Sequence, residues 1–195
     1  MTDFFDLGGI AGFAALLWQT LAGIVGWKGR PTLRFKPLDP NRDLRIWTFA
    51  NLNGQRRKFF TLEVTNTGKR TATRCVATLV IDQCPDGVNL TNSKFALHWA
   101  GIDYSIATTG AQPVDIGSED RRLDVAFTVE GQQHVGCWIA LPVALVLPIP
   151  NQAFLPPGRY EGNLSVSCEN GTGQTIRVRV YSPNNWTDLD AGRLN

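Results

Sequence analysis

Alternation of hydrophobic and polar residues is the dominant pattern of this chain, and it predicts β-strands. Between residues 59 and 65, Phe60, Leu62 and Val64 alternate with polar positions, as expected for a strand with one buried face. The same period returns in residues 74–81, whose inward positions are Cys75, Ala77, Leu79 and Ile81. Asn66 and Gly68, which tolerate the positive φ of a tight turn, separate the two stretches. Residues 59–81 are therefore expected to form a β-hairpin.

Further strands are predicted along the rest of the chain. Residues 123–129 place Leu123, Val125, Phe127 and Val129 on one face. Residues 159–168 and 176–180 also alternate, and the sequence Asn170-Gly171-Thr172-Gly173 between them is a hairpin turn. Shorter candidates cover residues 32–36, 44–49 and 95–99. We expect burial of Leu62, Val64, Leu79, Val125, Phe127, Leu164, Val166 and Val178.

These segments together indicate an all-β fold. Turn residues recur about every ten positions between residues 33 and 180, and no amphipathic helix interrupts them. This spacing is typical of an antiparallel β-sandwich with immunoglobulin-like (Ig-like) topology. The expected organisation is a membrane helix with its basic flank over residues 1–30, the sandwich over residues 31–182, and a polar tail over residues 183–195.

The N-terminal segment departs from the alternating pattern. Residues 7–27 carry no charge, and only Gln19 and Thr20 are polar. As a helix this segment is about 31 Å long, close to the hydrocarbon thickness of a bilayer. Acidic residues precede it, unlike the basic start of a signal peptide, and the absence of Lys and Arg within it disfavours a helix lying in the membrane plane. We therefore expect one transmembrane helix.

Small and polar residues recur along one side of this helix at steps of three or four. Gly8, Gly12, Ala15 and Gln19 are the candidate helix-packing residues, because small side chains let a second helix approach closely in lipid. The alternative is that glycine is simply common in membrane helices.

Basic residues follow the apolar segment in an uneven distribution. Twelve of the nineteen lysines and arginines lie between residues 28 and 74, where only three acidic residues oppose them. Positive charge beside a membrane helix favours the cytoplasmic side and attracts anionic lipid. The sandwich is thus expected in the cytoplasm, with lipid and topology contacts from Lys28, Arg30, Arg34, Lys36, Arg42 and Arg45. A solvated basic surface without a partner is the alternative.

Nucleic acid is a weaker candidate for the same charges. Arg56, Arg57 and Lys58 precede Phe59 and Phe60, a composition that suits phosphate contacts and base stacking. Strand alternation, however, places at least one of the two rings in the core.

Recognisable catalytic, cofactor and metal motifs are missing from the sequence. Neither a phosphate-binding glycine loop nor a dinucleotide fingerprint occurs. His98 is better explained as a strand residue packed near Trp99, His134 as a solvated turn residue, and Glu119-Asp120 as a turn. We expect a protein that is not an enzyme and holds no cofactor or metal.

The four cysteines form no metal-binding spacing. Cys75 and Cys168 occupy inward strand positions, where free thiols behave as small hydrophobic groups. In the cytoplasm all four, including Cys84 and Cys137, are expected to be reduced. A disulfide between the sheets stays open for an exported domain.

Three passages resemble a family of prokaryotic Ig-like domains with an N-terminal membrane anchor. They are the residues from Leu62 to Gly68 leading to Ala72 and Cys75, the sequence Arg122-Leu-Asp-Val125, and the turn Leu155-Pro-Pro-Gly-Arg-Tyr160. The resemblance covers roughly residues 55–181. Because these motifs are structural, the resemblance implies a fold and no activity.

Two functions are favoured by these features, and a soluble enzyme is the third alternative. The first is a membrane-anchored protein-interaction module, an accessory subunit whose sandwich binds another membrane protein. The alternative is a membrane effector that oligomerises with itself through its helix and senses a signal with the sandwich.

Overall fold

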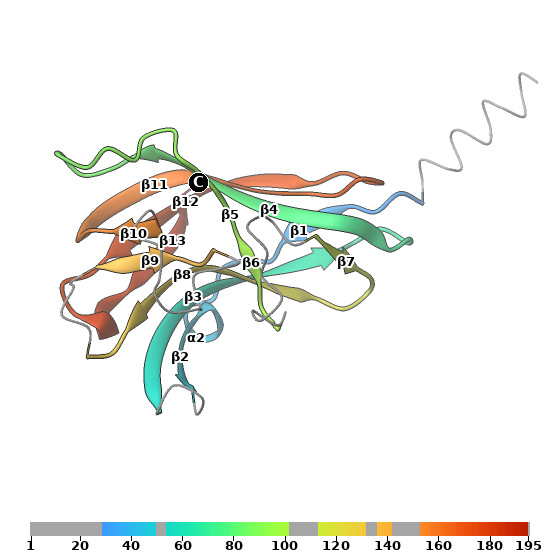
Figure 1. The fold of residues 1–195 in the computed structure, drawn as a ribbon. Coiled ribbons are helices and arrows are strands. Elements are labelled where there is room, and N and C mark those ends of the chain that lie inside the picture. Colours follow the sequence, from blue (N-terminus) through green and yellow to red (C-terminus); the bar gives the residue numbers. More distant parts are fainter. Residues whose placement is uncertain (1–28, 50–53, 102–112, 132–135, 142–152, 195) are drawn as a thin grey trace, which may run out of the picture.

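A computed structural model describes residues 29–49, 54–101, 113–131, 136–141 and 153–194. Two antiparallel sheets face one another in it (Figure 1), so the expected β-sandwich is confirmed. Within these ranges no helix has the length and hydrophobicity needed to cross a bilayer. The expected helix over residues 7–27 lies outside the described residues.

The first sheet contains seven strands in the order β1-β3-β8-β9-β10, with β2 also pairing with β3 and β6 with β8. Their bounds are β1 (Leu33–Phe35), β2 (Leu44–Phe49), β3 (Gln55–Asn66), β6 (His98–Trp99), β8 (Arg121–Val129), β9 (Cys137–Ile139) and β10 (Phe154–Leu155). A one-turn helix, α2 (Pro40–Asp43), joins β1 to β2. As a result, β1 and β2 pair with successive parts of the same side of β3.

The second sheet contains six strands in the order β13-β12-β11-β4-β5, with β7 also pairing with β4. Their bounds are β4 (Ala72–Gln83), β5 (Lys94–Ala96), β7 (Val114–Ile116), β11 (Gly158–Ser167), β12 (Gln174–Ser182) and β13 (Asp190–Leu194). The expected hairpin of β11 and β12 is present. The predicted strand over residues 95–99 is divided at Leu97, so that β5 belongs to the second sheet and β6 to the first.

Inward side chains of both sheets form one hydrophobic core. All eight residues expected to be buried have 2% exposure or less. Seven of the eight belong to this core, and Phe127 belongs to a separate cluster described below. Burial of an aliphatic side chain contributes about 1.5–3 kcal/mol, so the shared core is the main source of stability for the sandwich.

The expected hairpin over residues 59–81 is wrong in its pairing. Both strands exist, but β3 pairs with β1, β2 and β8, whereas β4 pairs with β5, β7 and β11. Asn66 directs the crossing: its Nδ2 donates to the carbonyls of Arg70 at 2.7 Å and Ile116 at 3.1 Å, and its Oδ1 accepts from the amide of Gly68. Turn residues specify a chain reversal, but they do not choose the strand that becomes the partner.

The expectation that residues 123–129 keep one inward face is also wrong. Phe60 lies opposite Ala126 but Thr61 lies opposite Asp124, so Val125 is an extra residue in β8. A bulge of this kind reverses the orientation of all later side chains. Phe127 therefore lies on the outer face of the first sheet.

Residues 183–195, expected as a polar tail, are largely part of the sandwich. A 3₁₀ turn, η4 (Trp186–Asp188), leads into β13, which pairs with β12. Leu189 and Ala191 are buried in the core. Their short apolar side chains are too isolated in the sequence to form a recognisable strand pattern.

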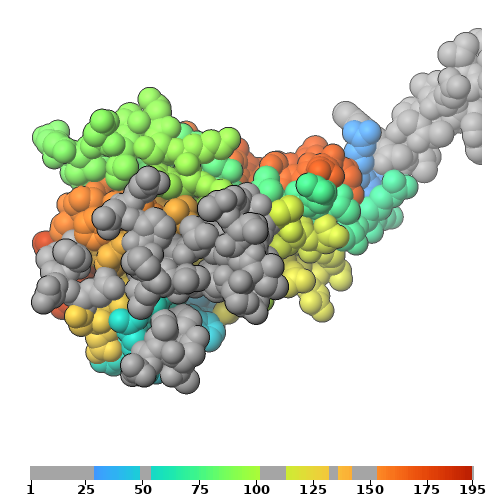
Figure 2. Space-filling view, viewed as in Figure 1, coloured from blue at the N-terminus to red at the C-terminus, as the bar shows by residue number. Residues whose placement is uncertain are grey.

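The N-terminal end of the described chain lies at one end of the sandwich. It runs beside the turn between β11 and β12 (Figures 1 and 2). There the amide of Leu33 donates to the carbonyl of Thr172 at 2.9 Å. The described chain therefore begins at this end of the sandwich.

Candidate functional site

The outer face of the first sheet, which points away from the core, carries polar and aromatic side chains. Thr61 lies opposite Asp124, and Glu63 lies opposite Arg122. Directly opposed residues in antiparallel strands project from the same face. Strands β3 and β8 thus place two carboxylates, a hydroxyl and a guanidinium next to one another.

A hollow of about 550 Å³ opens on this face. Its volume falls within the roughly 300–1,000 Å³ of ligand pockets. The lining comes from β2, β3, the residues after β6, and the start of β8: Trp47, Phe59, Thr61, Glu63, Ala100, Gly101, Asp120, Arg121, Arg122 and Asp124.

The lining has an aromatic part and a charged part. Trp47 on β2 is 46% exposed, and Phe59 beside it on β3 is buried. Glu63 and Arg122 belong to the charged part of the lining. An indole beside fixed charges can contact an apolar group and orient a polar one at the same time.

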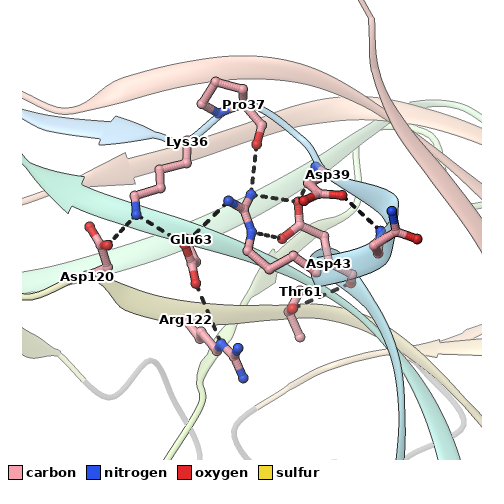
Figure 3. A network of polar contacts seen from close by, with 10 residues as sticks. Lys36, Pro37, Asp39, Asp43, Thr61, Glu63, Asp120 and Arg122 are labelled. Atoms are coloured by element: carbon pink, nitrogen blue, oxygen red, sulfur yellow. Dashed lines mark hydrogen bonds and ion pairs between the residues drawn. The ribbon is translucent and has the colours of Figure 1, made fainter.

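Glu63 is the centre of an ion-pair network at this site (Figure 3). Its carboxylate lies 3.3 Å from Lys36 Nζ, 3.6 Å from an Arg42 nitrogen and 3.8 Å from Arg122 Nε. Lys36 also forms an ion pair with Asp120. The network connects the β1–β2 segment to β3 and β8, so it holds the charged part of the hollow in place.

Helix α2 positions Arg42 within this network. Asp39 caps the N-terminus of the helix, because its Oδ1 accepts a hydrogen bond from the Asn41 amide at 3.0 Å. Pro40 occupies the first helical turn, where its missing N–H leaves no hydrogen bond unmade. The fully buried Asp43 accepts from the Asp39 amide at 2.8 Å and from Arg42 Nε at 2.7 Å. The local sequence thus forms a turn that aims Arg42 at Glu63.

The network also determines the protonation states of Lys36 and Asp120. The hydrogen bonds that Lys36 donates, first to Asp120 and then to Glu63, raise the pKa of Lys36, and the bond that Asp120 accepts from Lys36 lowers the pKa of Asp120. Lys36 and Asp120 are therefore both charged at neutral pH. A ligand entering the hollow meets charges that are already compensated by neighbours.

A histidine–aspartate pair lies deeper in the same face. His98 Nδ1 is 3.2 Å from Asp124 Oδ2, and both side chains are buried. Covalent catalysis needs a nucleophile beside such a base. Among the described lining residues the one hydroxyl is that of Thr61, which donates to the Asp43 carbonyl at 3.5 Å. The pair orients the Asp124 carboxylate, a role that suits binding.

An aromatic cluster adjoins the hollow at Phe59. The ring centroids of Phe59 and Phe127 are 5.3 Å apart, those of Phe127 and Trp138 6.0 Å, and those of Trp138 and Phe154 5.0 Å. Four rings from β3, β8, β9 and β10 therefore form a rigid support beside the hollow.

The sequence-predicted lipid and topology residues have different environments. Lys36 and Arg42 take part in the Glu63 network. Arg30 and Arg34 are exposed near the N-terminal end, and Arg45 is half-buried on β2. The remaining predicted residue of this group, Lys28, lies outside the described residues, as do the helix-packing residues Gly8, Gly12, Ala15 and Gln19.

Sequence reasoning missed the residues that build the hollow. Asp120, Arg122 and Asp124 approach β3 only through strand pairing, so no local pattern marks them. Trp47 had a usable signal, because residues 44–49 carry large apolar side chains on both faces of a short strand. Within the described ranges, no cluster of three or more His, Cys, Asp and Glu side chains could hold a metal ion.

No protein-family model matches the sequence of this chain, and no curated protein matches it.

Proposed function

We propose that this chain is a membrane-anchored interaction module, an accessory subunit whose Ig-like sandwich binds another membrane protein through the hollow in its first sheet. The observation that carries the proposal is the exposed indole of Trp47 beside the charged residues of the hollow. Tryptophan and arginine are the side chains most enriched at the energetic centres of protein interfaces.

The composition of the hollow favours a protein segment as its ligand. Trp47 offers an apolar contact, while Arg121 and Arg122 offer guanidinium groups close by. A peptide segment with an apolar side chain next to a carboxylate would satisfy both. Because the charges of the Glu63 network are compensated by one another, we expect a partner to be recognised by specific contacts in the hollow more than by long-range electrostatic attraction.

Membrane attachment is proposed from the apolar segment over residues 7–27. Two features of the chain support it: Arg30 and Arg34 are exposed, and they follow this segment in the sequence, where the described chain begins. Each basic side chain near an anionic surface adds up to about 1 kcal/mol of attraction. The cytoplasmic face is the proposed location of the sandwich.

The test is quantitative affinity purification of the tagged full chain from native membranes. The expected result is a stoichiometric membrane-protein partner that Trp47→Ala and Arg122→Ala both lose. Tyr181→Ala is the matched control, because Tyr181 is a similarly exposed aromatic (44%) on the second sheet. Equal recovery of the partner with all three variants would exclude the hollow as its binding site.

A further inference from the structure

Strand β2 lies at an edge of the first sheet. Among the described strands it pairs with β3 alone, and it is six residues long. The other short strands at sheet edges are less suited to pairing: β1, β5, β6, β7 and β10 have two or three residues, and β13 contains Asp190, Gly192 and Arg193. Strand β2 is therefore the best template for an added strand in the described part of the fold.

Two large apolar side chains are exposed on this edge. Ile46 is 51% exposed and Trp47 is 46% exposed, and as neighbours in a strand they project from opposite faces. Natural edge strands are usually protected by proline, lysine or a bulge. Strand β2 has neither proline nor lysine, Arg45 is its one charged residue, and its register with β3 is uninterrupted.

The pairing of β3 determines the direction in which each backbone amide and carbonyl of β2 points. The amide of Glu130 donates to the carbonyl of Arg56, so the backbone groups of Arg56 point toward β8. Because these groups alternate in direction, those of Arg57 and Phe59 point toward β2, where they meet Trp47 and Arg45. The amides and carbonyls of Ile46 and Thr48 consequently point to the open edge.

We propose that β2 pairs antiparallel with β2 of a second copy of this chain, across a two-fold axis at Ile46. In this register Ile46 faces Ile46 of the second copy, and Leu44 faces Thr48. The amides of Ile46 and Thr48 then meet the second copy's carbonyls of Ile46 and Leu44. The first sheets of the two copies would join into one continuous sheet.

The outer face makes this register self-complementary. Arg45 and Trp47 both project from it, because they lie opposite Phe59 and Arg57. Across the two-fold axis each Arg45 faces the second copy's Trp47. A guanidinium over an indole is a favourable cation–π contact, and the symmetry forms it twice.

This association is separate from helix packing through Gly8 and Gly12. The full chain in detergent distinguishes the two, with copy number measured by light scattering corrected for detergent. We expect two copies per particle for the wild type and for the double variant Gly8→Leu with Gly12→Leu. We expect one copy for Ile46→Lys, which places like charges against each other at the axis.

Thr48→Pro is the second test, because it removes an amide that points to the open edge and leaves the pairing with β3 intact. We expect one copy for this variant, and two for its control, Thr48→Val. Thermal unfolding verifies that each variant is folded. Trp47→Arg should also give one copy, and adding Arg45→Trp should restore two copies by exchanging the pair.

Self-pairing through β2 is overturned if the wild type has one copy over the whole concentration range. It is equally overturned if folded Ile46→Lys and Thr48→Pro keep two copies. One copy in complex with a different protein that Ile46→Lys releases would assign this edge to a foreign strand instead.

Discussion

Phe59 and Phe127 stack with ring centroids 5.3 Å apart on the outer face of the first sheet. Their chain neighbours Phe60 and Ala126 point into the core between the sheets. The bulge at Val125 creates this arrangement, because it brings Phe127 to the face that Phe59 occupies. The first sheet thus has a hydrophobic cluster on each side, and the outer one supports the hollow.

Phe127→Ala is expected to destabilise the sandwich by about 3–5 kcal/mol, because it removes a fully buried ring that contacts both Phe59 and Trp138. Chemical denaturation of the full chain in detergent measures this loss. Tyr181→Ala, at an exposed position, should change the free energy of unfolding by no more than about 0.5 kcal/mol. Similar small losses for both variants would contradict a packed outer cluster.

Arg42→Ala is expected to destabilise the fold by about 2–4 kcal/mol, because the buried Asp43 carboxylate loses its guanidinium partner. The partial exposure of Arg42 reduces the cost below that of a wholly buried pair. Arg74→Ala is the control, since its ion pair with Glu169 is exposed on both sides and is worth less than about 1 kcal/mol. Denaturation midpoints of the two variants provide the comparison.

Stability should fall at acidic pH through Asp120. The hydrogen bond from Lys36 holds the pKa of Asp120 below its usual value in the folded protein. A carboxylate whose folded pKa is lowered contributes stability above its unfolded pKa, and that contribution disappears as the pH falls through the folded pKa. Asp120→Asn should therefore lose stability at pH 7 and show a flatter decline below about pH 4. Thermal unfolding across pH tests this, and parallel curves for the two proteins would contradict it.

The thiols should differ in reactivity. All four cysteines are free in the structure, and burial, followed by the nearby Cys168, raises the pKa of Cys75 to about 12. The hydrogen bond with Thr91 lowers the pKa of the half-buried Cys84. Because the thiolate is the reactive form, Cys84 should be alkylated first at pH 8 and Cys75 only after unfolding. Peptide mass mapping measures the order. A Cys75–Cys168 disulfide in native material would instead indicate an oxidising compartment.

The proposed topology predicts protection of the sandwich. Protease added to intact cells should leave residues 31–195 whole, because basic residues after a membrane helix stay in the cytoplasm. Lys36 and Arg42 hold ion pairs in the fold, so the charge test is best restricted to Lys28, Arg30 and Arg34. Replacing these three with Glu should give mixed orientations. Digestion of the wild-type domain from outside would reverse the topology.

The strands and most of their buried faces could be predicted from the sequence alone. Residues 44–49 are a strand with the expected bounds, and inward positions such as Leu79, Leu164 and Val178 are buried as expected. This success has a local cause. A strand with one buried face needs apolar residues at every second position, and that requirement is met within a few residues of chain.

The choice of partner strands was decided only by the tertiary structure. The turn at Asn66 was visible in the sequence. The Asn66 side chain, however, donates hydrogen bonds to the carbonyls of Arg70 and Ile116, and the chain continues into the other sheet. The bulge at Val125 was invisible because it exists only in relation to β3. Strand pairing depends on all the strands that are available as partners, and no single segment of the sequence contains that information.

The candidate site depended on the same long-range pairing. Glu63 and Arg122 come together because β3 and β8 are neighbours, and Lys36 reaches Glu63 because α2 lets β1 and β2 share one side of β3. Composition revealed the basic segment but could not show that Lys36 and Arg42 are neutralised by carboxylates. Ion pairs form between charges that are a few ångströms apart in space, and the paired residues here are far apart along the chain.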